Sequence, residues 1–247
     1  MNGPAPQRFA RDLPSPVPPH PGDAAITPER GRLYRQVLAR RTRALCLVVE
    51  DCYDPHNATA IVRSADAFGV QRVCVVAGRN AFKVNRQVSQ GSHHYIDLEV
   101  YPDIAACAAR LRGDGYAIAV TDLAADACDP GALAQRAAGR PLALVFGNEG
   151  SGVSPAAAAL ADWRLLIPMI GFPQSLNLSV TVGVCLWALR GAAVVADAPG
   201  DLTAAEQSAL YDRWLRGHKP AAVEAALRRA GRHGEELDAI ASDPSLP

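Results

Sequence analysis

The chain has 247 residues, of which 49% are hydrophobic, so it can bury the core of one large domain with appendages. Its 25 basic and 25 acidic side chains cancel, and the overall charge therefore gives no sign of a nucleic-acid partner. The six cysteines form no CxxC pair and no His/Cys spacing typical of a metal site. We therefore expect reduced thiols in a cytoplasmic protein that lacks a signal peptide.

The N-terminal region is predicted to contain a tail and a short basic helix. Residues 1–25 are rich in proline and lack hydrophobic periodicity, which predicts disorder. Thr27 and Pro28 are typical of an N-cap and a first helical position, so residues 26–43 are expected to form a basic helix. Its arginines either decorate a solvated face or contact RNA phosphates. The candidates for phosphate contacts are Arg30, Arg32, Arg40 and Arg41.

Residues 44–197 show short apolar strands alternating with helices, which predicts an α/β domain with a parallel sheet. The expected strands are Ala44–Val49, Arg72–Val76, Tyr116–Thr121, Leu142–Phe146 and Arg164–Ile167. The expected helices are Ala58–Phe68, Ile104–Arg112, Ser154–Leu160 and Asn177–Val195.

The last of these helices lies in the most hydrophobic part of the chain. Arg190 interrupts its apolar run, which is also short for a membrane span, so we expect a buried or interface helix. Residues 198–247 are then expected to form a C-terminal helical extension. Its predicted helices are Thr203–Arg216 and Pro220–Ala230.

Polar or glycine-rich segments follow four of the predicted strands. In open parallel sheets, ligands bind beyond the carboxyl ends of the strands, so these segments predict one composite site. The segments are 54–63, 121–122, 147–152 and 168–177. The glycine order in the third segment differs from the dinucleotide-binding fingerprint, which disfavours a Rossmann oxidoreductase.

Taken singly, the polar residues of these segments have ordinary structural explanations. Asn57 would most often be a helix N-cap, and Arg63 would most often be a surface helix residue. Glu149 is either a structural cap or a residue that holds a ligand. His93 and His94 lack further candidate ligands, so no metal site is predicted.

Three segments together change this interpretation: Pro55–Asp66, Phe146–Gly152 and Ile167–Val180. In this order they resemble the three motifs of the SpoU methyltransferases, a family of the SPOUT superfamily that methylates RNA ribose 2′-hydroxyls with S-adenosylmethionine. The resemblance covers roughly residues 27–192. It implies a parallel-sheet α/β SPOUT fold with a C-terminal trefoil knot and a homodimer, here flanked by N- and C-terminal helical appendages.

The resemblance also implies roles for particular residues. Arg63 would bind an RNA phosphate and stabilise the developing alkoxide, since a guanidinium stays protonated at neutral pH. The residue that acts as the general base is not assigned. The implied catalytic residues are Arg63, Asn57, Glu149 and Asn177, with Ser179 supporting the same turn. The implied S-adenosylmethionine contacts are Thr121, Gly147, Ile167 and Leu176.

The implied substrate is tRNA, and the implied target within it is a guanosine of the D-loop. Ribosomal RNA is the alternative with the same chemistry, but the short segment before the first strand has no room for the separate N-terminal RNA-binding domain that is common in that branch. A catalytically inactive RNA-binding module is a further alternative. The presence of all four implied catalytic residues argues against it.

Overall fold

The computed structural model of the protein describes residues 9–52, 54–77 and 92–241, with the side chains of 93 and 232–241 left out. The chain divides into two compact units. The larger unit is Arg40–Asp201, which we call the sheet unit. The smaller unit combines Met1–Ala39 with Leu202–Pro247, and we call it the helical unit.

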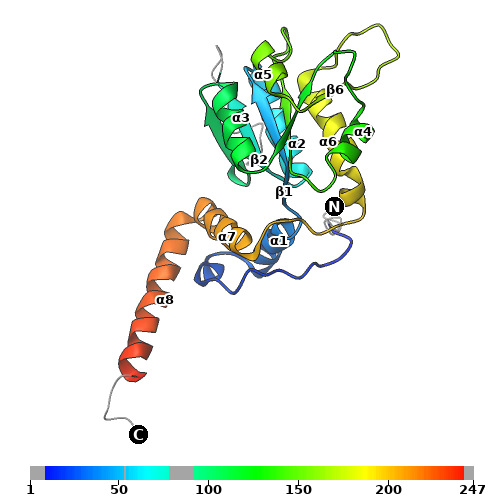
Figure 1. Cartoon of the computed structure of the whole chain (residues 1–247). Helices are drawn as coiled ribbons and strands as arrows, with labels where there is room; N and C mark the ends of the chain where they lie inside the picture. The colour runs from blue at the N-terminus through cyan, green and yellow to red at the C-terminus, as the bar shows by residue number, and fades with distance from the viewer. Residues whose placement is uncertain (1–8, 53, 78–91, 242–247) are drawn as a thin grey trace. The chain divides into compact units, whose positions relative to one another are not determined.

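The sheet unit, whose strands are drawn as arrows in Figure 1, is built on one sheet. This sheet has six strands in the order β3-β2-β1-β5-β4-β6. Every pair of neighbouring strands is parallel. The strands are β1 Thr42–Glu50, β2 Val70–Val76, β3 Asp97–Tyr101, β4 Ala117–Thr121, β5 Leu142–Phe146 and β6 Trp163–Leu165. The predicted parallel α/β sheet is therefore confirmed, and because all strands run the same way their carboxyl ends share one edge.

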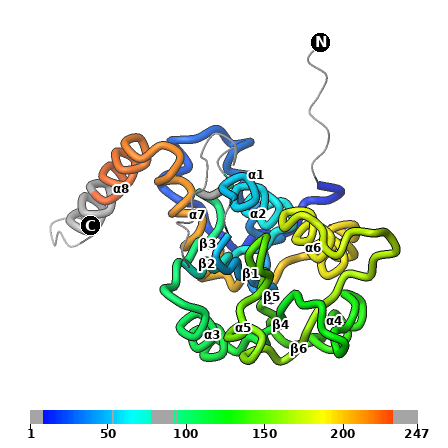
Figure 2. Tube along the Cα trace, turned by 90° about the horizontal axis from the view of Figure 1, so that it is seen from above, coloured from blue at the N-terminus to red at the C-terminus, as the bar shows by residue number. Residues whose placement is uncertain are grey.

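Helices cover both faces of this sheet (Figure 2). One face carries α2, Pro55–Ala67, together with α4, Pro130–Arg136, and α6, Leu178–Val195. The opposite face carries α3, Ile104–Gly113, and α5, Pro155–Leu160, which contact each other. Sheets of this kind are buried on both faces, which explains the apolar runs at residues 44–49 of β1, at 73–76 of β2 and along the whole of β5.

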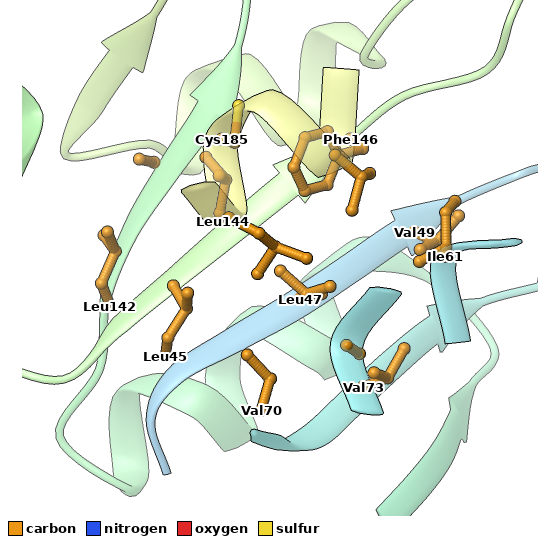
Figure 3. Packing of buried hydrophobic residues seen from close by; sticks show 14 of the residues in the cluster. Leu45, Leu47, Val49, Ile61, Val70, Val73, Leu142, Leu144, Phe146 and Cys185 are labelled. Atoms are coloured by element: carbon orange, nitrogen blue, oxygen red, sulfur yellow. The ribbon is translucent and has the colours of Figure 1, made fainter. Parts of the chain in front are cut away.

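The larger core cluster lies between the sheet and the face formed by α2 and α6 (Figure 3). Leu47 and Leu144 of the central strands are fully buried there, and Ile61 of α2 meets them from the helix side. Burying a side chain of this size contributes about 1.5–3 kcal/mol relative to leaving it exposed. The central strands and α2 are thus firmly held, and they provide a rigid base for the loops beyond them.

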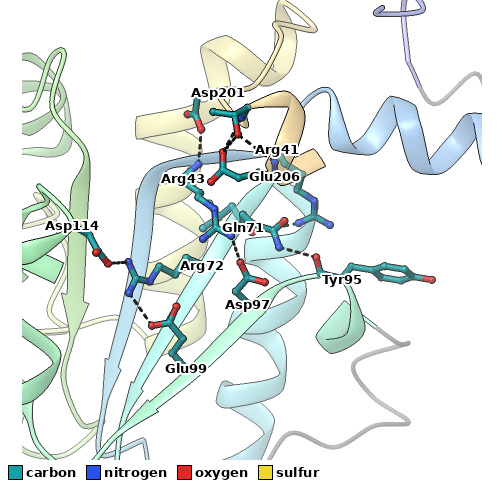
Figure 4. A network of polar contacts seen from close by, with 12 residues as sticks. Arg41, Arg43, Gln71, Arg72, Tyr95, Asp97, Glu99, Asp114, Asp201 and Glu206 are labelled. Atoms are coloured by element: carbon teal, nitrogen blue, oxygen red, sulfur yellow. Dashed lines mark hydrogen bonds and ion pairs between the residues drawn. The ribbon is translucent and has the colours of Figure 1, made fainter. Parts of the chain in front are cut away.

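The edge strand β3 was not predicted from the sequence, because Asp97 and Glu99 interrupt its apolar pattern. In the structure these two carboxylates are ion-paired with arginines of β1 and β2 (Figure 4). Arg43 of β1 contacts Asp97, and Arg72 of β2 contacts Glu99 at 2.8 Å. Arginines supplied by other strands therefore hold an edge strand that its own sequence does not indicate.

In the helical unit, α1, Pro28–Leu38, packs against α7, Ala204–His218, and the chain continues into α8, Pro220–Ala241. Tyr34 and Trp214 meet edge to face with ring centroids 5.6 Å apart. Thr27 caps α1 by accepting from the Arg30 N–H, as the sequence predicts. The two ends of the chain, expected as separate appendages, form one unit.

Two expectations for the N-terminal region are corrected by this unit. Residues 9–25 are not a disordered tail, because Leu13 exchanges backbone hydrogen bonds with the Gln36 amide, both at 2.8 Å, and Pro21–Ala25 forms a short 3-10 helix, η1. The expected helix 26–43 ends at Leu38. Residues 40–43 belong to the sheet unit, where β1 begins at Thr42. Residues 1–8 lie outside the described part of the chain.

Candidate functional site

The candidate site lies at the carboxyl ends of β1, β5, β4 and β6, which are neighbours in this order across the sheet. The segments predicted to carry the chemistry follow these four strands directly. Such an edge is where open parallel sheets bind their ligands, because loops and helix N-termini converge there.

The loop after β5 is a tight turn that requires glycine. Asn148 and Gly152 exchange two backbone hydrogen bonds of 2.9 Å, and Gly152 has a φ of +69°. A Cβ on Gly147 would lie 2.1 Å from the Gly152 carbonyl carbon, so no other residue fits there without moving the turn. The Asn148 amide donates to the Asp51 carbonyl at 2.7 Å and ties this loop to the end of β1.

Glu149 projects from this turn and meets the start of α2. Its Oε1 accepts a hydrogen bond from Asn57 Nδ2 at 2.9 Å and one from the Asp54 N–H at 3.3 Å. Asn57 is only 5% exposed, so its side-chain amide contacts other protein groups and not solvent. The N-cap of α2 is Asp54, which accepts from the His56 N–H, and the expectation that Asn57 itself caps this helix is wrong.

Asn177 completes the arrangement from the other side. Its Nδ2 donates to Asn57 Oδ1 at 3.1 Å, and its Oδ1 accepts from the Ser179 N–H and Oγ at 2.9 and 2.6 Å. Asn177 is therefore both the N-cap of α6 and the residue that orients Asn57. We call Asn57, Glu149 and Asn177 the amide–carboxylate cluster. Three segments far apart in the chain meet in it.

Arg63, the fourth implied catalytic residue, is exposed on α2. It lies six residues after Asn57 on this helix, about 240° further around the axis. The two side chains therefore leave α2 in different directions. Asn57 points into the amide–carboxylate cluster, whereas Arg63 lies on the solvent-exposed surface of α2.

The four implied cofactor residues lie beyond three adjacent strands. Thr121 ends β4 and donates its hydroxyl to the Val145 carbonyl of β5 at 3.3 Å, and Gly147 follows β5. Ile167 follows β6 and is partly buried against the core, while Leu176 is 36% exposed just before α6. Small-molecule sites combine apolar side chains with a few polar groups, and both kinds occur among these four positions.

The four arginines predicted to contact RNA do not lie on one helix. Arg32 is exposed and Arg30 is partly exposed, both on α1. Arg40 pairs with Asp197 in the sheet unit at 2.9 Å. The Arg41 side chain is only 1% exposed, pairs with Asp66 and donates to the Val70 carbonyl, and Figure 4 shows it inside the polar network. Burial and ion pairing leave Arg41 no surface for a phosphate.

The long helix α6 presents an apolar surface. By length and composition it is the one helix of the described chain that could cross a membrane, and 28% of it is buried. Its contacts with α2 and α4 place it on the face of the sheet. Its exposed apolar residues are Val180, Val184, Trp187, Val194 and Val195.

The parallel sheet, with its capped helices and glycine turn at the carboxyl edge, defines an α/β protein whose candidate site lies at that edge. No group of three or more His, Cys, Asp or Glu side chains within the described residues is arranged to hold a metal ion. Residues 44–187 match the SpoU rRNA Methylase family, and the chain belongs to this family.

Several proteins resemble this chain over most of their own length. The tRNA (guanosine(18)-2′-O)-methyltransferase of Thermus thermophilus is 37% identical over 161 residues, which cover 65% of this chain and 81% of that enzyme. The crystal structure of the Aquifex aeolicus TrmH/SpoU tRNA modifying enzyme superposes with a TM-score of 0.70 at 28% identity, over 77% of this chain and 97% of that one.

A third similar protein was solved with its methyl donor. The AdoMet-bound rRNA methyltransferase of Sinorhizobium meliloti superposes with a TM-score of 0.54 at 25% identity, over 60% of this chain and 56% of that one.

Proposed function

We propose that the protein transfers a methyl group from S-adenosylmethionine to the ribose 2′-oxygen of a guanosine in the D-loop of tRNA. The amide–carboxylate cluster carries the proposal, because it joins the three family motifs at the carboxyl edge of the sheet. The choice of tRNA follows the Thermus thermophilus relative, whose name specifies this reaction. As an enzyme acting on tRNA, the protein is placed in the cytoplasm.

S-adenosylmethionine supplies an electrophilic methyl group when it is bound. Thr121, Gly147, Ile167 and Leu176 are the residues proposed to hold it. The fit rests on the partly exposed Leu176, which offers apolar surface, and on the tight turn at Gly147, which packs so closely against Gly152 that it has no room for a side chain. The Sinorhizobium meliloti relative with bound AdoMet supports this choice.

The ribose hydroxyl is a weak nucleophile at neutral pH, so the protein has two tasks. The first is alignment of the reacting groups, which can lower a barrier by several kcal/mol. The amide–carboxylate cluster serves it by fixing the turn before α6 against α2. The second is stabilisation of the charge that develops on the oxygen. Arg63 serves it by binding the neighbouring RNA phosphate and placing its guanidinium beside the 2′-oxygen.

The helical unit is proposed to contact the tRNA backbone through Arg30 and Arg32 of α1. Both side chains have exposed surface, and guanidinium groups match phosphate oxygens in a bidentate manner. Arg40 and Arg41 are instead assigned to holding the start of the sheet unit, through Asp197 and Asp66.

The proposal includes a C-terminal trefoil knot and a homodimer. The exposed apolar residues of α6 support the dimer, because a contiguous apolar surface on a soluble protein marks a contact site. Trp187 is 58% exposed near the middle of this face. Replacing it with Glu is expected to shift the protein to monomers in light scattering after gel filtration, and an unchanged mass would remove α6 from the interface.

The decisive experiment uses labelled S-adenosylmethionine and unmodified tRNA transcripts. Label should enter a D-loop guanosine, and a transcript with the 2′-deoxy nucleotide at that position should take up none. Label that persists on the deoxy substrate would mean base methylation. If label is found on ribosomal RNA and not on tRNA, ribosomal RNA is the substrate of the same 2′-O-methylation.

A further inference from the structure

Cys52 lies between β1 and α2, directly beside the amide–carboxylate cluster. It is 5% exposed, and its Sγ is 3.4 Å from Glu149 Oε1. The same oxygen accepts from Asn57 Nδ2 at 2.9 Å and from the Asp54 N–H at 3.3 Å. One carboxylate oxygen thus accepts from three donors, two in the segment that joins β1 to α2 and one in the first turn of α2.

The thiol of Cys52 is held in its neutral form. Burial raises its pKa to about 12, and the nearby Glu149 carboxylate acts in the same direction through its charge and its hydrogen bond. A neutral thiol carries one hydrogen, and two acceptors lie within reach, Glu149 Oε1 at 3.4 Å and the Asp54 carbonyl at 3.5 Å. The carboxylate is the nearer and the more strongly negative of the two, so it takes the hydrogen.

The hydrogen bonds of the cluster all run toward this carboxylate. Asn177 donates to Asn57, and Asn57 donates to Glu149. In such a chain each bond polarises the next, so the position and charge of the terminal acceptor affect every member. A donor that fixes Glu149 therefore also fixes the orientation of Asn57 and, through it, the cap of α6.

We infer that Cys52 is a positioning residue of this site, whose thiol hydrogen bond holds the Glu149 carboxylate in the orientation that Asn57 requires. The inference rests on the proposed function only for its effect on turnover. The contact itself is a property of the folded chain and can be tested without substrate.

The activity test compares Cys52→Ala with Cys52→Ser, which keeps a donor of similar size. Cys52→Ala should lower the single-turnover rate about tenfold with an unchanged KM for tRNA, since a bond to a charged acceptor is lost. Cys52→Ser should recover most of the rate. Cys185→Ala is the matched control, because Cys185 is a fully buried core thiol whose pKa is raised by burial alone. Its rate should equal that of the wild type.

A double-mutant cycle separates positioning from packing. If Cys52 acts through Glu149, Cys52→Ala should cost nothing further in a Glu149→Ala background, which lacks the acceptor. Three outcomes would overturn the inference. Cys52→Ala could lower the rate equally in both backgrounds, Cys52→Ser could be as slow as Cys52→Ala, or Cys185→Ala could lose a similar fraction of the rate. Thermal melting of each variant shows whether a loss of rate merely follows a loss of folded protein.

Thiol labelling provides the test that needs no activity. Glu149→Gln removes the negative charge that helps to keep the thiol protonated, so Cys52 should react several times faster with iodoacetamide at alkaline pH. Mass spectrometry of the labelled peptides compares Cys52 with Cys185, whose rate should not change. An unchanged Cys52 rate refutes the contact. If the labelling shows the contact between Cys52 and Glu149 but the protein methylates no RNA, only the proposed function is refuted.

Discussion

Replacing Asn57 with Ala tests whether the amide–carboxylate cluster supports both the fold and the reaction. The substitution removes the bond to Glu149, at 2.9 Å, and the bond from Asn177, at 3.1 Å. A bond to a charged group contributes about 1.5–3 kcal/mol and a neutral one about 0.5–1.5 kcal/mol. Because Cys52 and Asp54 still donate to Glu149, we expect a loss of about 2–3 kcal/mol in the free energy of unfolding.

For a chain of this size, such a loss corresponds to a fall in Tm of about 5–10 °C. The single-turnover rate should fall more steeply than stability alone would require, because Asn177 and the turn before α6 lose their orientation. Calorimetry and a single-turnover methylation assay, both run well below the new Tm, separate the two effects.

Thr59→Val is the matched control for this prediction. Thr59 is fully buried on the same helix, and its hydroxyl donates to the Pro55 carbonyl at 2.7 Å. This variant should lose about 1 kcal/mol of stability and keep the wild-type turnover rate. If Asn57→Ala melts within about 1 °C of the wild type and turns over normally, the cluster described above has no energetic role.

Three further predictions address the remaining site residues. Arg63→Ala should lower turnover by about 10²–10³, the scale of one lost transition-state donor, with an unchanged cofactor dissociation constant in calorimetry; near-normal turnover would end its catalytic assignment. Leu176→Asp should abolish cofactor binding in a folded protein, because burying a carboxylate against an apolar ligand costs several kcal/mol, and an unchanged dissociation constant would place the cofactor elsewhere. Replacing Arg30 and Arg32 with Gln should weaken tRNA binding and reduce its salt slope by about two units, and a wild-type slope would mean that this face of α1 is merely solvated.

Much of the sheet unit could be predicted from the sequence, because its signals are local. The apolar runs of β1, β2 and β5 reflect burial on both faces of the sheet. The starts of α6 and, in the helical unit, of α1 are also local signals, because a side chain there accepts from nearby backbone N–H groups. The polar segments at strand ends identify the edge of the sheet that carries the site, and their motif resemblance indicates the family.

Contacts between distant residues could not be predicted in this way. The helix α4 is a single short element with little periodicity, and β3 depends on Arg43 and Arg72 for its ion pairs. The same limit explains Arg40 and Arg41, which look like part of a basic helix but are paired with Asp197 and Asp66. A sequence shows how many charges a segment has, whereas their partners depend on which strands and helices become neighbours.

The site itself shows the same division. The sequence by itself determined the residue types, the glycine-rich segment after β5 and the approximate start of α6, because each depends on a few consecutive residues. Only the tertiary structure decided that Asn57 bonds to both Glu149 and Asn177, and that Cys52 shares the Glu149 oxygen. These contacts join residues about a hundred positions apart in the chain, and they form only after parallel pairing has brought the carboxyl ends of β1 and β5 side by side.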